Sequence, residues 1–202
     1  MDNNYIVLKS LKSNQEKSAS IDLIKKFDEG NIPIWTLIET LSFGDFIKLY
    51  SLYYGVYGGY SYSAYLGSIK FLRNASAHNN CLLNSMRKPY SMKIRKNKEI
   101  MDVLAKSKKF TSSYKTKMEN PVIHDFVVLL FVFYDIMNTP ANRNMRDKGM
   151  SAIKALFFET MKRNDNVNLF IKNDVLVENY RFICDVIQYL ENCRNKPVLK
   201  NN

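Results

Sequence analysis

The chain has 202 residues, of which 46% are hydrophobic and 13% aromatic, and its formal net charge is +11. A chain with so many aromatic side chains to bury is not disordered, and its length suits one sizeable core, because compact domains cluster at about 100–150 residues. Seven glycines and five prolines leave few residues for tight turns. The composition therefore argues against a β-sandwich or barrel and favours an all-α domain.

Residues 1–20 are polar, so we expect a loose N-terminal arm, followed by a single helical domain over residues 21–198 whose first helix covers residues 21–27. The N-terminus lacks the apolar stretch of an export signal. The most apolar run, residues 126–134, has nine residues, well short of the roughly 20 that span a bilayer. These features predict a cytoplasmic protein with no membrane partner.

The three cysteines form neither a CxxC pair nor a metal-ligand spacing with histidine, so we expect reduced thiols and neither a metal nor another cofactor. They are Cys81, Cys184 and Cys193.

Helical apolar spacing recurs along the chain and predicts a bundle of five to seven helices. Pro33 precedes a helix with Trp35 on its apolar stripe, so we expect Trp35 to fill the core. A break follows, in which Gly44 permits a tight turn and either Ser42 or Asp45 is the candidate N-cap of the next helix.

A cluster of tyrosines surrounds residues 55–59, which we expect to form a loop. Such tyrosines either line a seam between helices or stack on unpaired bases, and their helical spacing favours the seam. They are Tyr50, Tyr53, Tyr54, Tyr57, Tyr60, Tyr62 and Tyr65.

The rest of the chain predicts four further helices, over residues 62–86, 119–138, 151–163 and 174–193. The helix over 119–138 is apolar nearly all round, so we expect it at the centre of the core. Ser151 is the candidate N-cap of the helix that follows it.

Most of the excess charge lies in residues 87–117, which we interpret as a basic insert in the helical domain. This segment holds eleven Lys and Arg against two acidic residues, a net charge of +9. Such a cluster attracts a polyphosphate backbone, and its binding would depend strongly on salt. The alternative is a solvated basic loop with no defined partner.

One short segment holds a combination of residues suited to RNA cleavage without a metal. Arg73 and His78 are five positions apart on a predicted helix, about 140° apart around its axis, and Asn74 lies one turn from His78. Histidine exchanges protons near neutral pH, and arginine stabilises charge on a phosphate. In such a reaction the ribose 2′-hydroxyl attacks the adjacent phosphate and leaves a 2′,3′-cyclic phosphate and a 5′-hydroxyl.

That reaction uses both a base and an acid, and a symmetric homodimer would supply two copies of the imidazole. Taken alone, an arginine and a histidine at this spacing are common, and a surface arginine beside a partly buried histidine is the simpler interpretation. The other histidine, His124, stands beside Asp125 on the most apolar helix, where we expect a packed or capping side chain. Signatures of P-loops, dinucleotide-binding loops and zinc proteases are absent from the sequence.

Two blocks of sequence resemble the Abi-like (abortive infection) family within the HEPN-domain ribonucleases. The first, Pro33-Ile34-Trp35-Thr36-Leu37-Ile38-Glu39-Thr40-Leu41-Ser42-Phe43-Gly44 with Leu49-Tyr50, resembles the family's Pro-x-Trp…Glu…Ser-Phe-Gly…Leu-Tyr pattern. The second, Leu72-Arg73-Asn74 with Ala77-His78, resembles its Arg-Asn-x-x-Ala-His pattern, an arginine followed after four to six residues by a histidine. The family pattern continues with Arg-Leu-x-Asn-Arg, where this chain has Cys81-Leu82-Leu83-Asn84-Ser85 and neither arginine.

The resemblance implies a HEPN-like helical bundle that forms a homodimer and cleaves RNA in phage defence or as a toxin. It assigns catalysis to His78 and Arg73, with Asn74 orienting, and leaves Glu39 as a candidate support for Arg73. A small regulatory RNA or an antitoxin is a further candidate partner. The residues expected to bind RNA are Asn84, Arg87, Lys88, Lys93, Arg95, Lys96 and Lys98.

Two other functions remain open on the sequence. One is an RNA-binding HEPN protein without turnover, which binds or is regulated by a small RNA. The other is a helical interaction protein in which the Arg–His pattern is inert.

Overall fold

The structure, a computed structural model, describes residues 33–80, 82, 86, 88, 90, 96–107, 109–110, 113–163, 167–168, 172–193 and 196–199. These residues form eight α-helices and no strand, which confirms the all-α class with slightly more helices than expected. The chain divides into two compact units, Met1–Leu66 and Gly67–Asn202, which we describe separately. The predicted arm and the helix over 21–27 lie outside the described residues.

The first unit contains α3 (Ile34–Thr40), α4 (Phe43–Tyr57) and the start of α5 (Ser63–Ala77). Of the two candidate N-caps of α4, the structure selects Ser42: its hydroxyl accepts from the Asp45 N–H at 3.1 Å and donates to the Asp45 carboxylate at 2.7 Å. Gly44, expected in the break, instead lies inside α4. The cap explains this, because it starts the helix immediately after Ser42.

The loop expected over residues 55–59 is shorter than predicted, because α4 continues to Tyr57. Only Gly58 and Gly59 make the turn, with φ of 71° and 97°. Glycine adopts this left-handed region without the steric cost of a Cβ atom.

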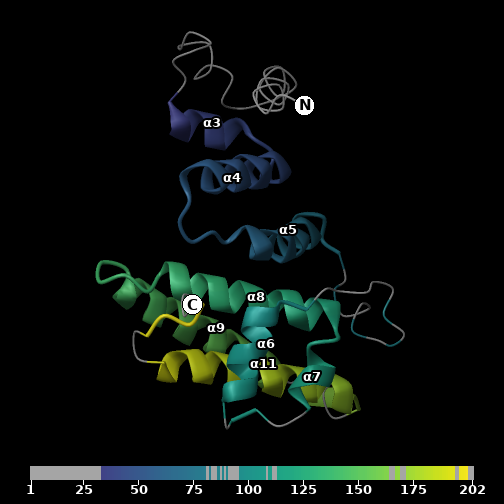
Figure 1. The fold of residues 1–202 in the computed structure, drawn as a ribbon. Helices are drawn as coiled ribbons and strands as arrows, with labels where there is room; N and C mark the ends of the chain where they lie inside the picture. The colour runs from purple at the N-terminus through teal and green to yellow at the C-terminus, as the bar shows by residue number, and fades with distance from the viewer. Residues whose placement is uncertain are drawn as a thin grey trace. The chain divides into compact units, whose positions relative to one another are not determined.

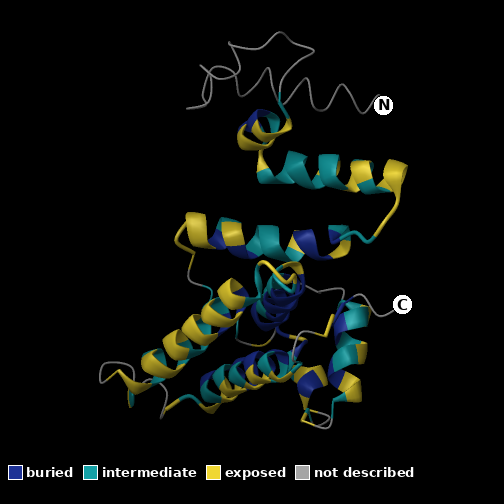
Figure 2. Ribbon diagram, turned by 90° about the vertical axis from the view of Figure 1, so that its left-hand side faces the viewer, coloured by how far each residue is buried: buried dark blue, intermediate teal, exposed yellow. Residues whose placement is uncertain are grey.

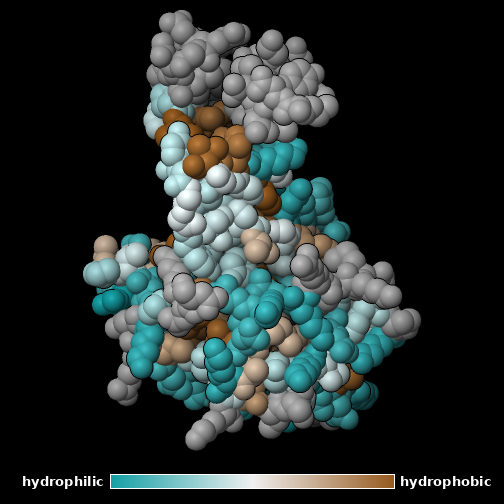
Figure 3. Space-filling view, viewed as in Figure 1, coloured by the Kyte–Doolittle hydropathy of each residue, from teal (hydrophilic) through white to brown (hydrophobic). Residues whose placement is uncertain are grey.

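Trp35 does not fill the core, contrary to the prediction, since it is 51% exposed. On α3 the buried side chains are Thr36 and Thr40, one turn apart, whereas Ile34 and Ile38 are exposed. The helix therefore turns its threonine side inward and its apolar side outward. Figure 3 shows a hydrophobic patch, in brown, over α3.

The tyrosine cluster has an inward part and an outward part. The Tyr50 hydroxyl accepts from the Tyr62 N–H at 3.3 Å, and Tyr62 and Tyr65 are buried, as a seam between helices requires. Tyr53 and Tyr57 are 54% and 74% exposed. Along its whole length α4 has no buried residue, and it is teal and yellow throughout in Figure 2.

The predicted helix over 62–86 is wrong at its C-terminal end, because α5 ends at Ala77. Asn79 has a φ of 55°. Its N–H donates to the Ser76 carbonyl at 3.2 Å, and the Asn80 N–H donates to the Ala75 carbonyl at 2.9 Å. This is a Schellman arrangement, which asparagine permits because it tolerates the left-handed conformation better than most residues.

The second unit is built around α8 (Pro121–Ile136), α9 (Arg143–Lys162) and α11 (Asp174–Asn192). These three helices pack against one another, and the unit also contains the end of α5, α6 (Lys98–Lys106) and α7 (Tyr114–Lys117) (Figure 1). Twelve of the sixteen residues of α8 are buried, which confirms the prediction of a central helix over 119–138. The predicted helix over 174–193 is also confirmed.

The helix predicted over 151–163 begins eight residues earlier, so Ser151 is in its interior and is not an N-cap. The additional residues include Gly149, where a Cβ atom would lie 2.8 Å from the end of the Phe133 ring. Glycine thus lets α9 continue close beside α8. In the part of the chain that the structure describes, no helix is both long and apolar enough to cross a bilayer.

Replacing Asn120 by alanine should lower the free energy of unfolding by about 1–2 kcal/mol, because the central helix loses its N-cap. The Asn120 side chain is buried and accepts from the N–H groups of Val122 (3.0 Å) and Ile123 (3.3 Å). The measurement is equilibrium unfolding in urea. Asn142→Ala is the matched control, since Asn142 precedes α9 without a side-chain capping bond; equal losses in the two variants would contradict the prediction.

Candidate functional site

Arg73, Asn74 and His78 stand at the C-terminal end of α5, in the second unit. Arg73 and His78 are exposed and Asn74 is half-buried. Because α5 ends at Ala77, His78 occupies the C-cap, with its N–H still donating to the Asn74 carbonyl at 2.9 Å. The imidazole is therefore open to solvent, in contrast to the simpler interpretation of a partly buried histidine.

Arg73 and Asn74 are in direct contact, since Arg73 Nη1 donates to Asn74 Oδ1 at 3.1 Å. With its oxygen engaged in this way, the Asn74 amide presents its N–H groups, and the guanidinium has further N–H groups to offer. The pair is thus a cluster of hydrogen-bond donors, which suits a phosphate or another anion.

His78 is not joined to this pair through its side chain. Among the residues that the structure describes, no hydrogen bond or ion pair links the Arg73 guanidinium to the His78 ring. This agrees with the angle of about 140° that five helical steps produce. A single chain therefore brings together the arginine and the asparagine, and leaves the imidazole exposed without a contact to the arginine.

Glu39 is exposed on α3, in the first unit, whereas Arg73 belongs to the second. A supporting contact between the two side chains remains a prediction.

The described part of the basic segment is largely helical and partly buried, unlike a solvated loop. Its described part contains α6 and α7, and Ile100, Leu104 and Tyr114 are buried in the second unit. Of the residues expected to bind RNA, the structure describes three: Lys88 and Lys98, which are exposed, and Lys96, which is half-buried. The others lie outside the described residues: Asn84, Arg87, Lys93 and Arg95.

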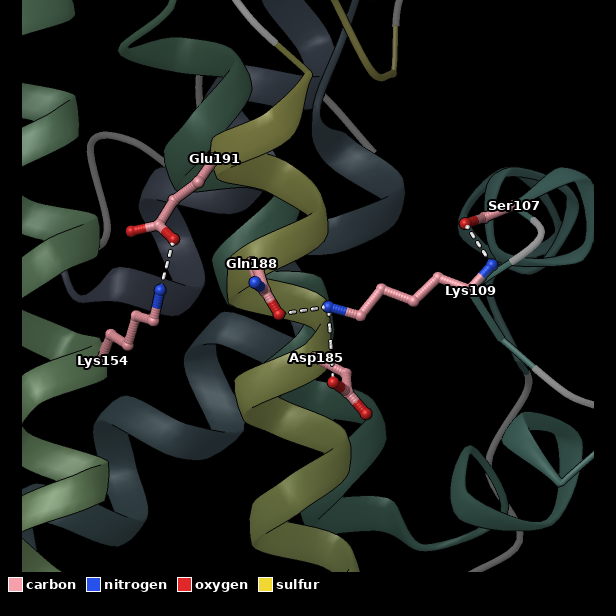
Figure 4. Close-up of polar contacts among 6 residues, drawn as sticks. All are labelled: Ser107, Lys109, Lys154, Asp185, Gln188 and Glu191. Carbon is pink, nitrogen blue, oxygen red and sulfur yellow. Dashed lines mark hydrogen bonds and ion pairs between the residues drawn. The ribbon is translucent and has the colours of Figure 1, made fainter.

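Several lysines of the segment form ion pairs with carboxylates of the same chain. Lys96 pairs with Glu119 at 3.3 Å, and Lys117 pairs with Glu178 of α11. Lys109 reaches Asp185 at 3.4 Å and the Gln188 side chain at 2.6 Å, both on α11 (Figure 4). The charge available to a partner is accordingly smaller than the sequence count suggests.

Other lysines of the segment point their charge to solvent. Within the described ranges Lys98, Lys106 and Lys115 are exposed and have no ion pair. Lys88 lies with its Nζ 5.8 Å from the centre of the Tyr90 ring. These four are the described lysines of the segment that have no carboxylate partner in the described residues.

A cleft of about 610 Å³ lies between α6, the end of α11 and residues 196–198. Lys98, Lys106 and Lys196 line it, together with the acidic Glu99 and Asp102 and with Tyr189. Sequence analysis missed Lys196, since nothing in the chain order places it beside α6. A hydrogen bond from the Val198 N–H to the buried Asp135 carboxylate, at 3.2 Å, holds the C-terminal segment there. Burial raises the pKa of Tyr189 to about 12, so its hydroxyl keeps its proton.

Cys184 and Cys193 are free thiols, as predicted. Burial raises the pKa of both thiols, which makes them weak nucleophiles at neutral pH. Cys81 lies outside the described residues. Across the described parts of the chain, no group of three or more His, Cys, Asp or Glu side chains is placed to hold a metal ion.

The interpretation of His124 as a packed and capping histidine is confirmed. The ring is 3% exposed, its Nδ1 lies 2.9 Å from Asp125 Oδ1, and its Nε2 accepts from the Asn97 N–H at 3.2 Å. Because Nε2 accepts, the proton is on Nδ1, which donates to Asp125. Both ring nitrogens are engaged, so His124 is not available for proton transfer to a substrate.

The pairing of Lys117 with Glu178 should be visible in a titration. The hydrogen bond and charge of Lys117 lower the pKa of the Glu178 carboxyl. A folded pKa below the unfolded value of about 4.3 means that the pair stabilises the fold above that pH, and that this contribution is lost as pH falls through the folded pKa. Carboxyl-carbon NMR should give a Glu178 midpoint below about 4.3, returning toward it in Lys117→Met. The control is Lys115→Met; an unchanged midpoint in Lys117→Met would show that the pair does not form.

Comparison with known proteins bears on the N-terminal part of the chain. No curated protein and no solved structure matches the chain. A family model does match: residues 2–84 fit the model of the Abi-like protein family. The matched region includes both blocks of sequence described above and the Arg73–His78 site, and it ends before α6. Residues 2–84 of the chain thus resemble the Abi-like family.

Proposed function

We propose that this protein is a metal-independent endoribonuclease of the HEPN type, acting in abortive infection or as a toxin. The match of residues 2–84 to the Abi-like family model supports the role in defence. The observation that carries the proposal is the end of α5, where the exposed His78 lies one helical turn from Asn74, which Arg73 contacts. These are the groups that cleavage through the 2′-hydroxyl requires.

In the proposed reaction His78 takes the proton of the ribose 2′-hydroxyl, and the 2′-oxygen attacks the adjacent phosphorus. The bond from phosphorus to the 5′-oxygen breaks, and that oxygen receives a proton from a second imidazole. Arg73 and the Asn74 amide donate to the phosphate oxygens as negative charge builds on them. The products are a 2′,3′-cyclic phosphate and a 5′-hydroxyl.

The second imidazole comes from a second copy of the chain. His124, the other histidine of the sequence, is occupied on both ring nitrogens and buried. A composite site in a symmetric homodimer therefore supplies the acid and the base from two His78 side chains. RNA is held outside the reacting groups by the solvent-facing lysines, Lys88, Lys98, Lys106 and Lys115.

The alternative is an RNA-binding HEPN protein without turnover. Two observations favour it: Cys81 and Ser85 stand where the family pattern has arginines, and three lysines of the basic segment are already paired with carboxylates. Such a protein would retain RNA, a small regulatory RNA among the candidates, and leave its length unchanged.

Cleavage of bulk RNA in EDTA tests the proposal. The wild-type protein should shorten the RNA and create 2′,3′-cyclic phosphate ends, whereas His78→Ala should reduce the rate at least about 100-fold, as expected for loss of a general acid–base group. Arg73→Ala should reduce it comparably, because charge on the phosphate is no longer stabilised.

Ser76→Ala is the matched control, since Ser76 is exposed on the same turn of α5 and has no proposed role. All variants should keep the wild-type circular dichroism and thermal midpoint. Equal cleavage by wild type and His78→Ala would remove His78 from the mechanism. Retention of RNA without new ends, in the wild type, would favour the alternative.

Two triple variants separate lysines that bind RNA from lysines that support the fold. Replacing Lys98, Lys106 and Lys115 by alanine should weaken RNA binding and lower the slope of log K against log salt by about 2, at about 0.7 per phosphate of a single strand. Replacing Lys96, Lys109 and Lys117 should change that slope less and lower the thermal midpoint more, because these side chains are paired with carboxylates of the same chain. Filter binding at several salt concentrations measures the slopes, and equal slopes in the two variants would contradict the assignment.

A further inference from the structure

The cleft of about 610 Å³ beside α6 is anchored on both of its sides. On one side Asn97, the N-cap of α6, donates its backbone N–H to the buried His124 ring. On the other side the Val198 N–H donates to the buried Asp135 carboxylate. Because two buried side chains of α8 fix the walls, the cleft is pre-formed, and its volume lies within the range of about 300–1,000 Å³ that is usual for small-molecule sites.

One face of α6 forms a wall of this cleft. Ile100 and Leu104 are buried on the opposite face, about 150° away at 100° per residue. The residues on the cleft face lie within about 140° of one another around the helix axis. They are Lys98, Glu99, Asp102, Val103 and Lys106.

The cleft holds charges of both signs that are not paired within the chain. In the described part of the structure Lys98, Lys106 and Lys196 have no ion pair, and neither has Asp102. Lys98 and Lys106 are about 12 Å apart along the helix axis, with Asp102 midway between them. A ligand that suits this wall therefore carries an anionic group for the lysines and, separate from it, hydroxyl or amino groups that donate to a carboxylate.

The wall on the other side adds apolar surface. Tyr189 and Cys193 are half-buried and lie one turn apart at the end of α11, and Pro197 and Val198 follow Lys196. A tyrosine ring with aliphatic neighbours suits a planar ring of a ligand, since binding sites combine apolar walls with a few polar groups that set orientation.

We propose that this cleft binds a nucleotide, with the phosphate on the lysines, the ribose hydroxyls or base amino groups on Asp102, and the base against Tyr189. The site lies outside residues 2–84, which the family model matches, and the inference does not rest on RNA cleavage. The nucleotide is either a free molecule or one unit of a bound RNA, since Lys98 and Lys106 are also among the lysines proposed to hold RNA.

Isothermal titration calorimetry of the full-length protein with the four common ribonucleoside 5′-monophosphates tests the site. At least one should bind with a dissociation constant below about 1 mM. Its nucleoside and inorganic phosphate each lack one half of the contacts, so each should bind at least about tenfold more weakly. Lys196→Ala should weaken nucleotide binding at least about tenfold, because a charge-assisted hydrogen bond to the phosphate is lost.

Asp102→Ala separates a nucleotide site from a simple patch of positive charge. Loss of the carboxylate should weaken nucleotide binding at least about fivefold, because the ligand's donors lose their acceptor. Binding of inorganic phosphate should stay unchanged or become tighter, because a repelling charge is gone. Lys148→Ala and Glu159→Ala are the matched controls, exposed on α9 and outside the cleft, and should keep the wild-type affinity.

Competition with a single-stranded RNA, measured in His78→Ala, distinguishes the two sources of the nucleotide. If the RNA supplies it, the monophosphate displaces the RNA and Lys196→Ala weakens the binding of both. If the ligand is a free nucleotide, the monophosphate leaves RNA binding unchanged.

Dissociation constants above about 1 mM for all four monophosphates would overturn the proposal. Wild-type nucleotide affinity in either Lys196→Ala or Asp102→Ala would overturn it as well, as would tighter nucleotide binding in Asp102→Ala. Nucleotide affinity should be the same in wild type and His78→Ala, so the outcome is independent of whether the protein cleaves RNA.

Discussion

The burial of α8 on nearly every side is the constraint on which the second unit depends. A helix in this position must satisfy each of its polar groups inside the protein, because a buried polar group without a partner is costly. Asn120 satisfies the first turn, and His124 and Asp135 bond to backbone N–H groups of Asn97 and Val198. These two bonds bring the start of α6 and the C-terminal segment to the same helix.

The position of the basic groups follows from those bonds. Asn97 is the N-cap of α6, so the contact with His124 fixes where Lys98 and Lys106 begin their helix. The contact between Asp135 and Val198 fixes Lys196 on the other side of the same cleft. Lys98 and Lys106 of α6 and the distant Lys196 are thus brought to one cleft by two buried side chains of α8, and Lys109 and Lys117 form ion pairs with α11.

The sequence predicted the elements whose signals are local. The apolar run of α8, the stripe of α11 and the cap at Ser42 were all found, because burial all round, helical spacing and a capping hydroxyl each leave a pattern within a few residues. The packed role of His124 followed in the same way from its apolar surroundings. Two helix boundaries were predicted wrongly. The end of α5 depends on the rare backbone conformation of Asn79, and the early start of α9 depends on a contact between elements, where Gly149 faces Phe133.

Trp35 is a further case in which a local sequence pattern did not predict which side of a helix is buried. Its helical spacing was found, but the side of α3 that turns inward carries Thr36 and Thr40, and no periodicity reveals that a helix buries its threonines.

The candidate site includes both a feature that the sequence predicted and one that it did not. The order Arg73-Asn74…His78 was visible in the sequence, and so was the angle between its ends, whereas the exposure of His78 depends on α5 ending at the residue before it. Had the helix continued to residue 86, as its few breakers suggest, the imidazole would have been one more side chain along a helix wall. The left-handed Asn79 instead ends the helix and leaves the imidazole exposed at its C-cap.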